Sequence, residues 1–110
     1  MKLPNGEHAI VEIDKLLHYC LDRDHPRGRH KARVFASALG LTIEHAPFLR
    51  EQLKAAARSA EATRTEDSEF GAHYRVDFDV VHGDRRAVVR SCWIIRKDDL
   101  VPRLTRCWVL

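Results

Sequence analysis

Apolar residues in the first half of the chain recur every three or four positions, which is the spacing of one helix face. Asp14 is expected to cap a first helix that ends near Asp24, because His25 precedes a proline and is biased away from helical geometry. Apolar positions within residues 32–39 predict a second, amphipathic helix, and Gly40 supplies the left-handed residue that ends it. Two helices joined by a basic loop are therefore expected here.

A third helix is expected to follow Thr42, whose side chain can cap it. The helix should restart at Pro47, because proline is tolerated in the first turn and not further inside. Its apolar side chains run from Phe48 to Ala60. From Ala62 to Glu69 the apolar pattern stops and polar side chains accumulate, so this stretch is expected to be an exposed connection.

The second half of the chain alternates apolar and polar residues instead of following a helical period. Residues 74–80 alternate strictly, which predicts a strand with one buried and one solvated face. Residues 82–84 form the expected hairpin turn, and residues 86–96, apolar on both sides, are typical of a central strand. Residues 104–109 form a last strand, and residues 9–12 could add an edge strand.

Helices followed by a β-meander predict one α+β domain over residues 1–110. The N-terminal helices are expected to pack on one face of an antiparallel sheet of three to four strands, which leaves the other face free. The polar side chains of that free face depend on a register that the sequence does not fix. They are Arg75, Asp77, Asp79 and Arg90, joined by either Arg106 and Trp108 or Arg103 and Thr105.

Composition narrows the class of protein. Apolar residues make up 45% of the chain and charged residues 32%, which is typical of a globular domain. No apolar run approaches the roughly 20 residues that cross a bilayer, and the start of the chain has no signal-peptide pattern, so a cytoplasmic protein without membrane contact is expected. Cys20, Cys92 and Cys107 form no paired motif and are expected to be reduced.

Arginine dominates the basic residues. The net charge is only +3, yet 14 of the 19 basic residues are arginine, whose planar side chain can bind phosphate through two hydrogen bonds. A genome rich in G and C would explain the same bias. The densest basic stretch, residues 23–33, runs into a helix N-terminus, which attracts phosphate. If this loop is functional, His25 or His30 moves protons and Lys31 stabilises a charged transition state; otherwise the loop is simply solvated.

Other chemistry has little support in the sequence. Neither metal nor cofactor is expected, because no glycine-rich phosphate motif occurs and the one conceivable ligand group has no standard spacing: His18, Cys20, His25 and His30. Ser91 and Cys92 lie within a strand and not on the sharp turn that presents a nucleophile. Asp77 and Asp79 share one strand face, where polar alternation explains them better than a carboxylate pair. His73 looks like an ordinary strand-end histidine.

Several stretches of the chain resemble a known family. They are Leu21–Phe35, which contains the pattern His-Pro-x-Gly-x-x-Lys-Ala-x-x-Phe, then Ala38–Leu41, Val89–Ile95 and Pro102–Thr105. The sequence resembles an uncharacterised bacterial domain family, whose members are small stand-alone proteins or C-terminal domains of polymorphic toxins and of proteins related to phage head morphogenesis. The resemblance implies a possible partner, because stand-alone members are often encoded beside a small β-rich protein. It assigns no reaction and no catalytic residues.

Toxin domains with helices first and an antiparallel sheet last also resemble the metal-independent ribonucleases that include barnase, RelE and colicin nucleases. By this analogy the leading hypothesis is a toxin-type ribonuclease that binds RNA and needs no metal. The candidate catalytic residues are His25, His30, Lys31, Arg90 and Thr105. The candidate substrate-binding residues are Arg27, Arg29, Arg33, Arg75 and Trp108, the last as a surface that can stack a base. The alternatives are an antitoxin or immunity module that binds a protein, and a phosphate- or nucleic-acid-binding domain without turnover.

Overall fold

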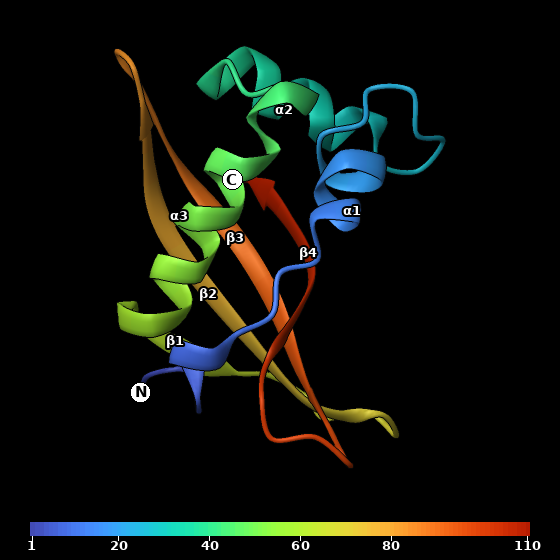
Figure 1. Ribbon diagram of the computed structural model, residues 1–110, viewed down its shortest axis with the longest axis vertical. Helices are drawn as coiled ribbons and strands as arrows, with labels where there is room; N and C mark the ends of the chain where they lie inside the picture. Colours follow the sequence, from blue (N-terminus) through green and yellow to red (C-terminus); the bar gives the residue numbers. More distant parts are fainter.

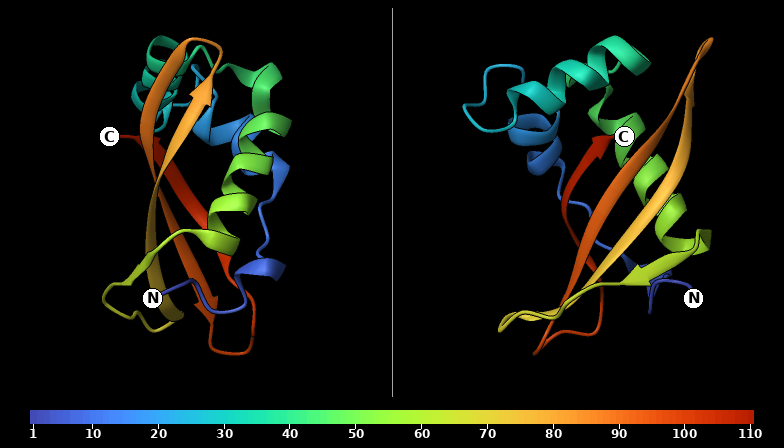
Figure 2. Two further views of the ribbon diagram at one scale, coloured as in Figure 1. Left: turned by 90° about the vertical axis from the view of Figure 1, so that its left-hand side faces the viewer. Right: turned by 180° about the vertical axis from the view of Figure 1, so that it is seen from behind.

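The computed structural model describes all of residues 1–110 and has the predicted α+β architecture, with helices first and a four-stranded antiparallel sheet last. The strands follow one another across the sheet in chain order, and α3 packs along one face of it (Figures 1 and 2). They are β1 (Ala62–Arg64), β2 (Gly71–His82), β3 (Arg85–Arg96) and β4 (Arg103–Val109).

The helical half consists of three main pieces. α1 (Ile13–Lys15) continues directly into the π-helical turn η2 (Leu16–Cys20). α2 (Arg29–Leu39) lies across the upper end of the molecule in Figure 1 and packs against β4 and β3. α3 is Ala46–Ser59, and the short 3-10 turns are η1 (Gly6–His8) and η3 (Ile43–His45). None of these helices has the length and continuous apolar surface that a bilayer span requires.

The first helix differs from its sequence prediction at both ends. It begins at Ile13 with Glu12 in the cap position, so Asp14 lies inside the first turn and the prediction that it caps the helix was wrong. The helix ends at Cys20 instead of near Asp24. The Asp22 carboxylate accepts the Asp24 N–H at 2.9 Å, and a side chain that bonds the backbone two residues on starts a turn that competes with helix.

The boundaries of the next two helices were predicted well. Gly40, with a φ of 68°, ends α2, and its N–H bonds back to the helix. Thr42 and His45 form a capping box at η3, and Pro47 falls in the first turn of α3, where its missing N–H costs no hydrogen bond. Caps and prolines act locally, which explains why these positions could be identified from the sequence.

The stretch after α3 is not only a connection. Ala62–Arg64 forms the edge strand β1, which pairs antiparallel with residues 74–76 of β2. Three residues are too few to show an alternating pattern, so the pairing depends on β2 lying alongside. Residues 9–12, by contrast, do not form the suggested edge strand, because only Ile10 makes a single parallel bridge, to Arg103 of β4.

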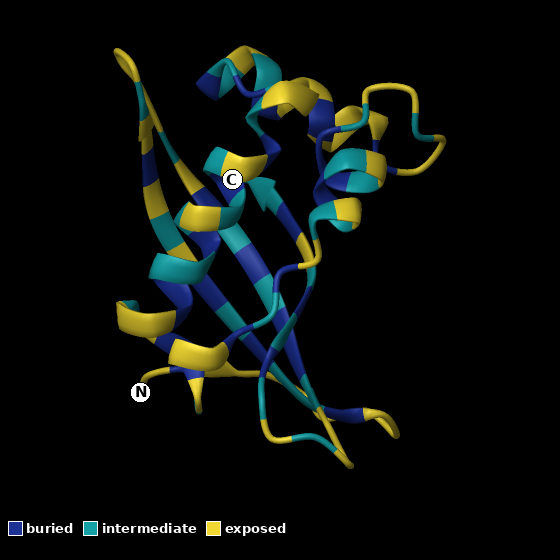
Figure 3. Cartoon of the chain, in the orientation of Figure 1, coloured by how far each residue is buried: buried dark blue, intermediate teal, exposed yellow.

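The core lies between the helices and the inner face of the sheet (Figure 3). Its largest fully buried side chains are Trp93 of β3 and Phe35 of α2, both 0% exposed. The one buried polar side chain, Ser91, donates to the Val76 carbonyl at 2.7 Å and accepts the Trp93 indole N–H at 2.9 Å. Every buried polar side-chain atom thus has a partner.

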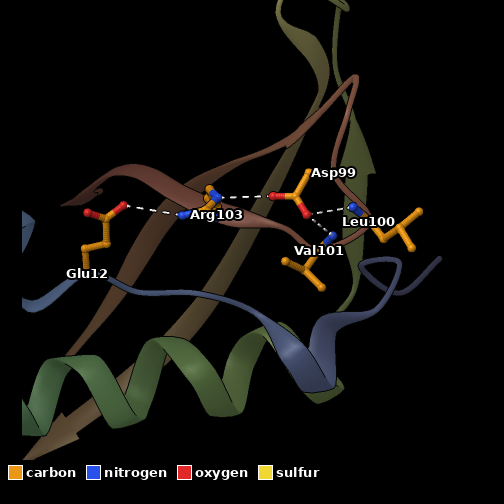
Figure 4. A network of polar contacts seen from close by, with 5 residues as sticks. All are labelled: Glu12, Asp99, Leu100, Val101 and Arg103. Carbon is orange, nitrogen blue, oxygen red and sulfur yellow. Dashed lines mark hydrogen bonds and ion pairs between the residues drawn. The ribbon is translucent and has the colours of Figure 1, made fainter.

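A polar network fixes the turn between β3 and β4 (Figure 4). Asp99 accepts the backbone N–H groups of Leu100 and Val101 and pairs with Arg103 at 3.2 Å. These backbone bonds, together with the Arg103 guanidinium, lower the pKa of Asp99 below its ordinary value. Arg103 also lies 3.7 Å from Glu12, so its side chain is held at this turn.

Candidate functional site

The sheet face that points away from α3 carries a wide cavity of about 880 Å³, which we call the open-face cavity. Successive side chains of a strand point to opposite faces of the sheet, so every second residue, those of one parity, lies on the same side. The polar residues of the cavity are the alternate residues of β2, β3 and β4 that point to this face. The loop between β1 and β2 forms one wall. The lining residues are Thr65, Glu66, Asp67, Ser68, His73, Tyr74, Arg75, Arg90, Cys92, Thr105, Arg106 and Trp108.

A bulge in β4 settles the register that the sequence left open. The pairing of β3 with β4 shifts between Cys92 and Trp93, which leaves Thr105 as the additional residue on β4. As a result, Arg106, Trp108 and Thr105 all line the open-face cavity, so members of both predicted alternatives lie there. The Thr105 hydroxyl donates to the Cys92 carbonyl at 3.1 Å.

Arg90 lines the cavity and is held there by Asp77 of the neighbouring strand. Its Nε and Nη2 atoms each donate to one carboxylate oxygen of Asp77 at 2.9 Å. This two-pronged bond lowers the pKa of Asp77 and raises that of Arg90. Asp77 therefore forms an ion pair with Arg90 and does not act as a carboxylate pair with Asp79.

Two further arginines of the cavity form no ion pair within the chain. Neither Arg75 nor Arg106 forms an ion pair with a carboxylate of the chain. They lie on β2 and β4 opposite the same β3 residue, Cys92, so they flank it from both sides. Two strand spacings separate them, about 10 Å, so a phosphate between the strands is within reach of both long side chains.

His73 belongs to this cavity, although its sequence position suggested an ordinary surface residue. Its Nε2 atom lies 2.8 Å from the Ser68 hydroxyl, which also accepts the Phe70 N–H at 3.1 Å. The Ser68 hydroxyl, on the loop between β1 and β2, therefore holds the His73 ring in place. The signal that identifies it is parity, since His73 lies on the same side of β2 as Arg75.

Glu66 and Asp67 bring carboxylates to the same wall of the cavity. Asp67 pairs with Arg64 at 2.8 Å, and this contact lowers the pKa of the Asp67 carboxyl. Glu66 forms no ion pair and follows Thr65, whose N–H donates to the His73 carbonyl at 2.9 Å. The lining of the cavity thus includes one imidazole and one carboxylate that forms no ion pair.

Lys31 is the one residue of the predicted basic loop that reaches the open face. From the first turn of α2, its Nζ atom lies 4.3 Å from the centre of the Trp108 ring. A crevice of about 10 Å³ beside it joins the turn at Gly28 to Arg106 and Cys107 of β4. The turn therefore contacts the β4 edge of the open face without covering the face itself.

The other predicted residues of this segment lie outside the open-face cavity: His25, Arg27, Arg29, His30 and Arg33. The His25 Nδ1 atom accepts the N–H groups of Arg27 and Gly28, both at 3.0 Å, and its ring packs on Tyr19. Four predicted residues thus line the open-face cavity: Arg75, Arg90, Thr105 and Trp108. Lys31 is not a lining residue and contacts the cavity only through Trp108.

The cysteines and acidic groups form no further centre. Cys20, Cys92 and Cys107 form no disulfide in the structure. Cys20 and Cys107 are buried near each other, and contact with Cys20 together with burial raises the pKa of the Cys107 thiol well above its ordinary value. No group of three His, Cys, Asp or Glu side chains has the arrangement of a metal site.

The fold and the cavity together define an α+β domain with a polar open sheet face. The chain belongs to the family described as a domain of unknown function, DUF6883, whose model matches residues 2–110. A solved structure titled as a contact-dependent growth inhibition toxin–immunity protein complex from Klebsiella pneumoniae 342 contains a similar chain, with a TM-score of 0.70 and 15% identity. The match covers 92% of this chain and 99% of that chain, and at this identity it shows a shared fold. Comparison with curated protein sequences gives no significant match.

Proposed function

We propose that this protein is a toxin-type, metal-independent ribonuclease that acts on RNA backbone phosphates and is one member of a toxin–antitoxin-like pair. The observation that carries the proposal is the open-face cavity, where unpaired Arg75 and Arg106 lie with His73 on one concave surface. The fold shared with a chain of a toxin–immunity complex supports the toxin context. A protein partner of the immunity type fits the same context.

The cavity residues supply the groups that RNA cleavage without metal needs. A base removes the proton of a ribose 2′-hydroxyl, the 2′-oxygen attacks the neighbouring phosphorus, and the bond to the 5′-oxygen breaks as that oxygen is protonated. His73 is assigned one of the two proton transfers, because imidazole exchanges protons near neutral pH. Glu66, a lining residue of the same cavity that forms no ion pair, is assigned the other.

The arginines and Thr105 are assigned to the phosphate. Negative charge grows on the non-bridging oxygens in the transition state, and preorganised donors lower the barrier most at that point. Arg75 and Arg106 approach from two sides, and Arg90 is already fixed by Asp77. His25 and His30 lie outside the cavity, so the proposal moves the proton transfers predicted for them to His73.

The direct test is cleavage of cellular RNA by the purified protein in EDTA, which removes divalent metals. We expect cleavage by the wild type and a loss of about 10²- to 10⁴-fold in His73→Gln, the usual contribution of a general acid or base. His8→Gln is the matched control, because His8 is an exposed histidine on η1. Intact RNA with the wild-type protein would refute the ribonuclease. Loss of activity in His30→Gln but not in His73→Gln would assign the proton transfer to His30 of α2 instead.

Expression separates the ribonuclease from its two rivals. A toxin arrests growth unless its partner is present, whereas an antitoxin or immunity module is harmless alone. A phosphate- or nucleic-acid-binding domain without turnover would bind RNA in a salt-dependent way and release no product. Growth arrest that disappears in Arg75→Ala and Arg106→Ala variants of unchanged stability is the outcome expected for the ribonuclease.

A further inference from the structure

Trp108 is placed differently from the other tryptophan of the chain. Trp93 is 0% exposed and its indole N–H is bonded to Ser91 in the core. Trp108 is only half-buried, lines the open-face cavity, and donates its indole N–H to no atom of the protein. Its ring therefore makes a smaller contribution to the core and presents aromatic surface to the cavity.

Two cations lie against this ring without a carboxylate to neutralise them. Lys31 Nζ is 4.3 Å from the ring centre and Arg106 Cζ is 5.4 Å from it. Neither side chain forms an ion pair, and both are exposed. Both cations lie over the ring in cation–π contact, so a base can stack on Trp108 only where its anionic groups draw the two side chains off the ring face. A planar ring that carries anionic groups on both sides does this, and one nucleotide within a chain has that form.

From this arrangement we propose that Trp108 is the stacking platform for one unpaired base of a single-stranded RNA, whose adjoining phosphates bind Lys31 and Arg106. The inference rests on the proposed ribonuclease function and names its substrate class. A base inside a duplex is stacked on its neighbours and hidden from an indole ring, so double-stranded RNA cannot use this platform.

Strand geometry separates the platform from the reacting groups. Trp108 and Asp77 both lie opposite Arg90, and His73 lies four residues along β2 from Asp77. At 3.3–3.4 Å per residue, His73 is roughly 13 Å from the platform along the strands. Arg75 and Arg106 lie opposite Cys92, between these two positions, so the phosphate that Arg106 binds is the scissile one and also adjoins the nucleotide whose base stacks on Trp108. A mononucleotide cannot fill both places.

The probe is a short 2′-O-methyl oligouridylate, which binds as RNA but cannot be cleaved because its 2′-oxygens carry no proton. Tryptophan fluorescence reports binding, and buried Trp93 supplies a constant background. We expect the oligomer to quench the wild-type emission and Trp108→Leu to abolish the quenching. Direct titration should show affinity reduced about 5- to 150-fold in Trp108→Leu, since stacking of one base contributes about 1–3 kcal/mol.

The control variants and ligands isolate the platform. Lys31→Ala and Arg106→Ala should each weaken binding of the oligomer. Each should also reduce the slope of log affinity against log salt concentration by about 1, the effect of one lost phosphate contact. Lys54→Ala on α3 should change neither quantity. The same oligomer annealed to its complement, and uridine monophosphate alone, should bind more weakly. Circular dichroism of each variant establishes that its fold is unchanged.

The outcomes separate the platform from the nuclease. Cleavage of unmodified RNA with equal oligomer affinity in wild type and Trp108→Leu would overturn the platform and leave the ribonuclease standing. Quenching that depends on Trp108, without cleavage of unmodified RNA, would support the platform and overturn the ribonuclease. Equal binding of single and double strands, or no binding by the folded protein, would also overturn the platform.

Discussion

The buried hydrogen bonds of Ser91 give the most direct test of how the sheet supports its open face. Ser91 accepts the Trp93 indole N–H and donates to Val76, and all three residues are 0% exposed. Ser91→Ala removes the acceptor and leaves the Trp93 N–H in the core, where no water can replace it. We expect the free energy of unfolding to fall by about 2 kcal/mol, within the ~1–3 kcal/mol that an orphaned buried donor costs.

Urea unfolding followed by circular dichroism measures this loss. With a slope of about 2 kcal/mol per M, the midpoint should fall by about 1 M. Ser59→Ala is the matched control, because the Ser59 hydroxyl also donates to a backbone carbonyl, at 2.9 Å, but is exposed on α3. Its stability should change by no more than about 0.5 kcal/mol.

A double-mutant cycle with Trp93→Phe isolates the hydrogen bond from the packing. Phenylalanine has no N–H, so in that background Ser91→Ala should cost less, with a coupling energy of about 1 kcal/mol or more. Equal losses in Ser91→Ala and Ser59→Ala, or a coupling energy near zero, would show that the indole bond does not stabilise the sheet and would refute the reasoning.

Three further predictions address the backbone, the basic turn and the acid response. Gly71→Ala should lower the free energy of unfolding by more than about 2 kcal/mol, because φ is +156° and the added Cβ overlaps the backbone of β3. Gly83→Ala is also at positive φ but has open space around it, so its free energy of unfolding should fall by only about 1 kcal/mol. Thermal melts of the two variants measure the difference. His25→Ala should destabilise the turn while His25→Asn, which keeps an acceptor for the two N–H groups, should not; equal melting temperatures would contradict this role. Because its arginine partner lowers the pKa of Asp77, the carboxylate stabilises the fold above the ordinary aspartate pKa near 4, and this contribution disappears as the pH falls through the lower folded pKa. The stability difference between wild type and Asp77→Asn should thus be present at pH 7 and shrink in strong acid, and a difference that does not change with pH would contradict the ion pair.

Local signals in the sequence were sufficient for most of the elements. Gly40, Thr42 and Pro47 mark helix ends through their own backbone preferences, and the structure has those ends. The short strand β1 was missed, because three residues show no period and need β2 beside them. The first helix ended early, because the Asp22 side chain competes for the backbone.

The candidate site was predicted only in part. Parity alone placed Arg75 and Arg90 on the free face, since alternate residues of a strand share a side. His73 lies on the same side of β2, but its place in the cavity became evident only from the structure, where the loop that carries Ser68 lines the same cavity and bonds to the ring. The basic turn was predicted to be functional from its charge, yet only Lys31 of its candidate residues contacts the open face, through Trp108.

The sequence by itself determined the second and third helices, the long strands and the side of each strand that is polar, because these follow from spacing along a continuous chain. Only the tertiary structure decided the bulge at Thr105, which places both that residue and Trp108 in one cavity. It also decided that Lys31 meets Trp108. Both depend on how distant segments pack and pair, and no local preference of either segment specifies its partner.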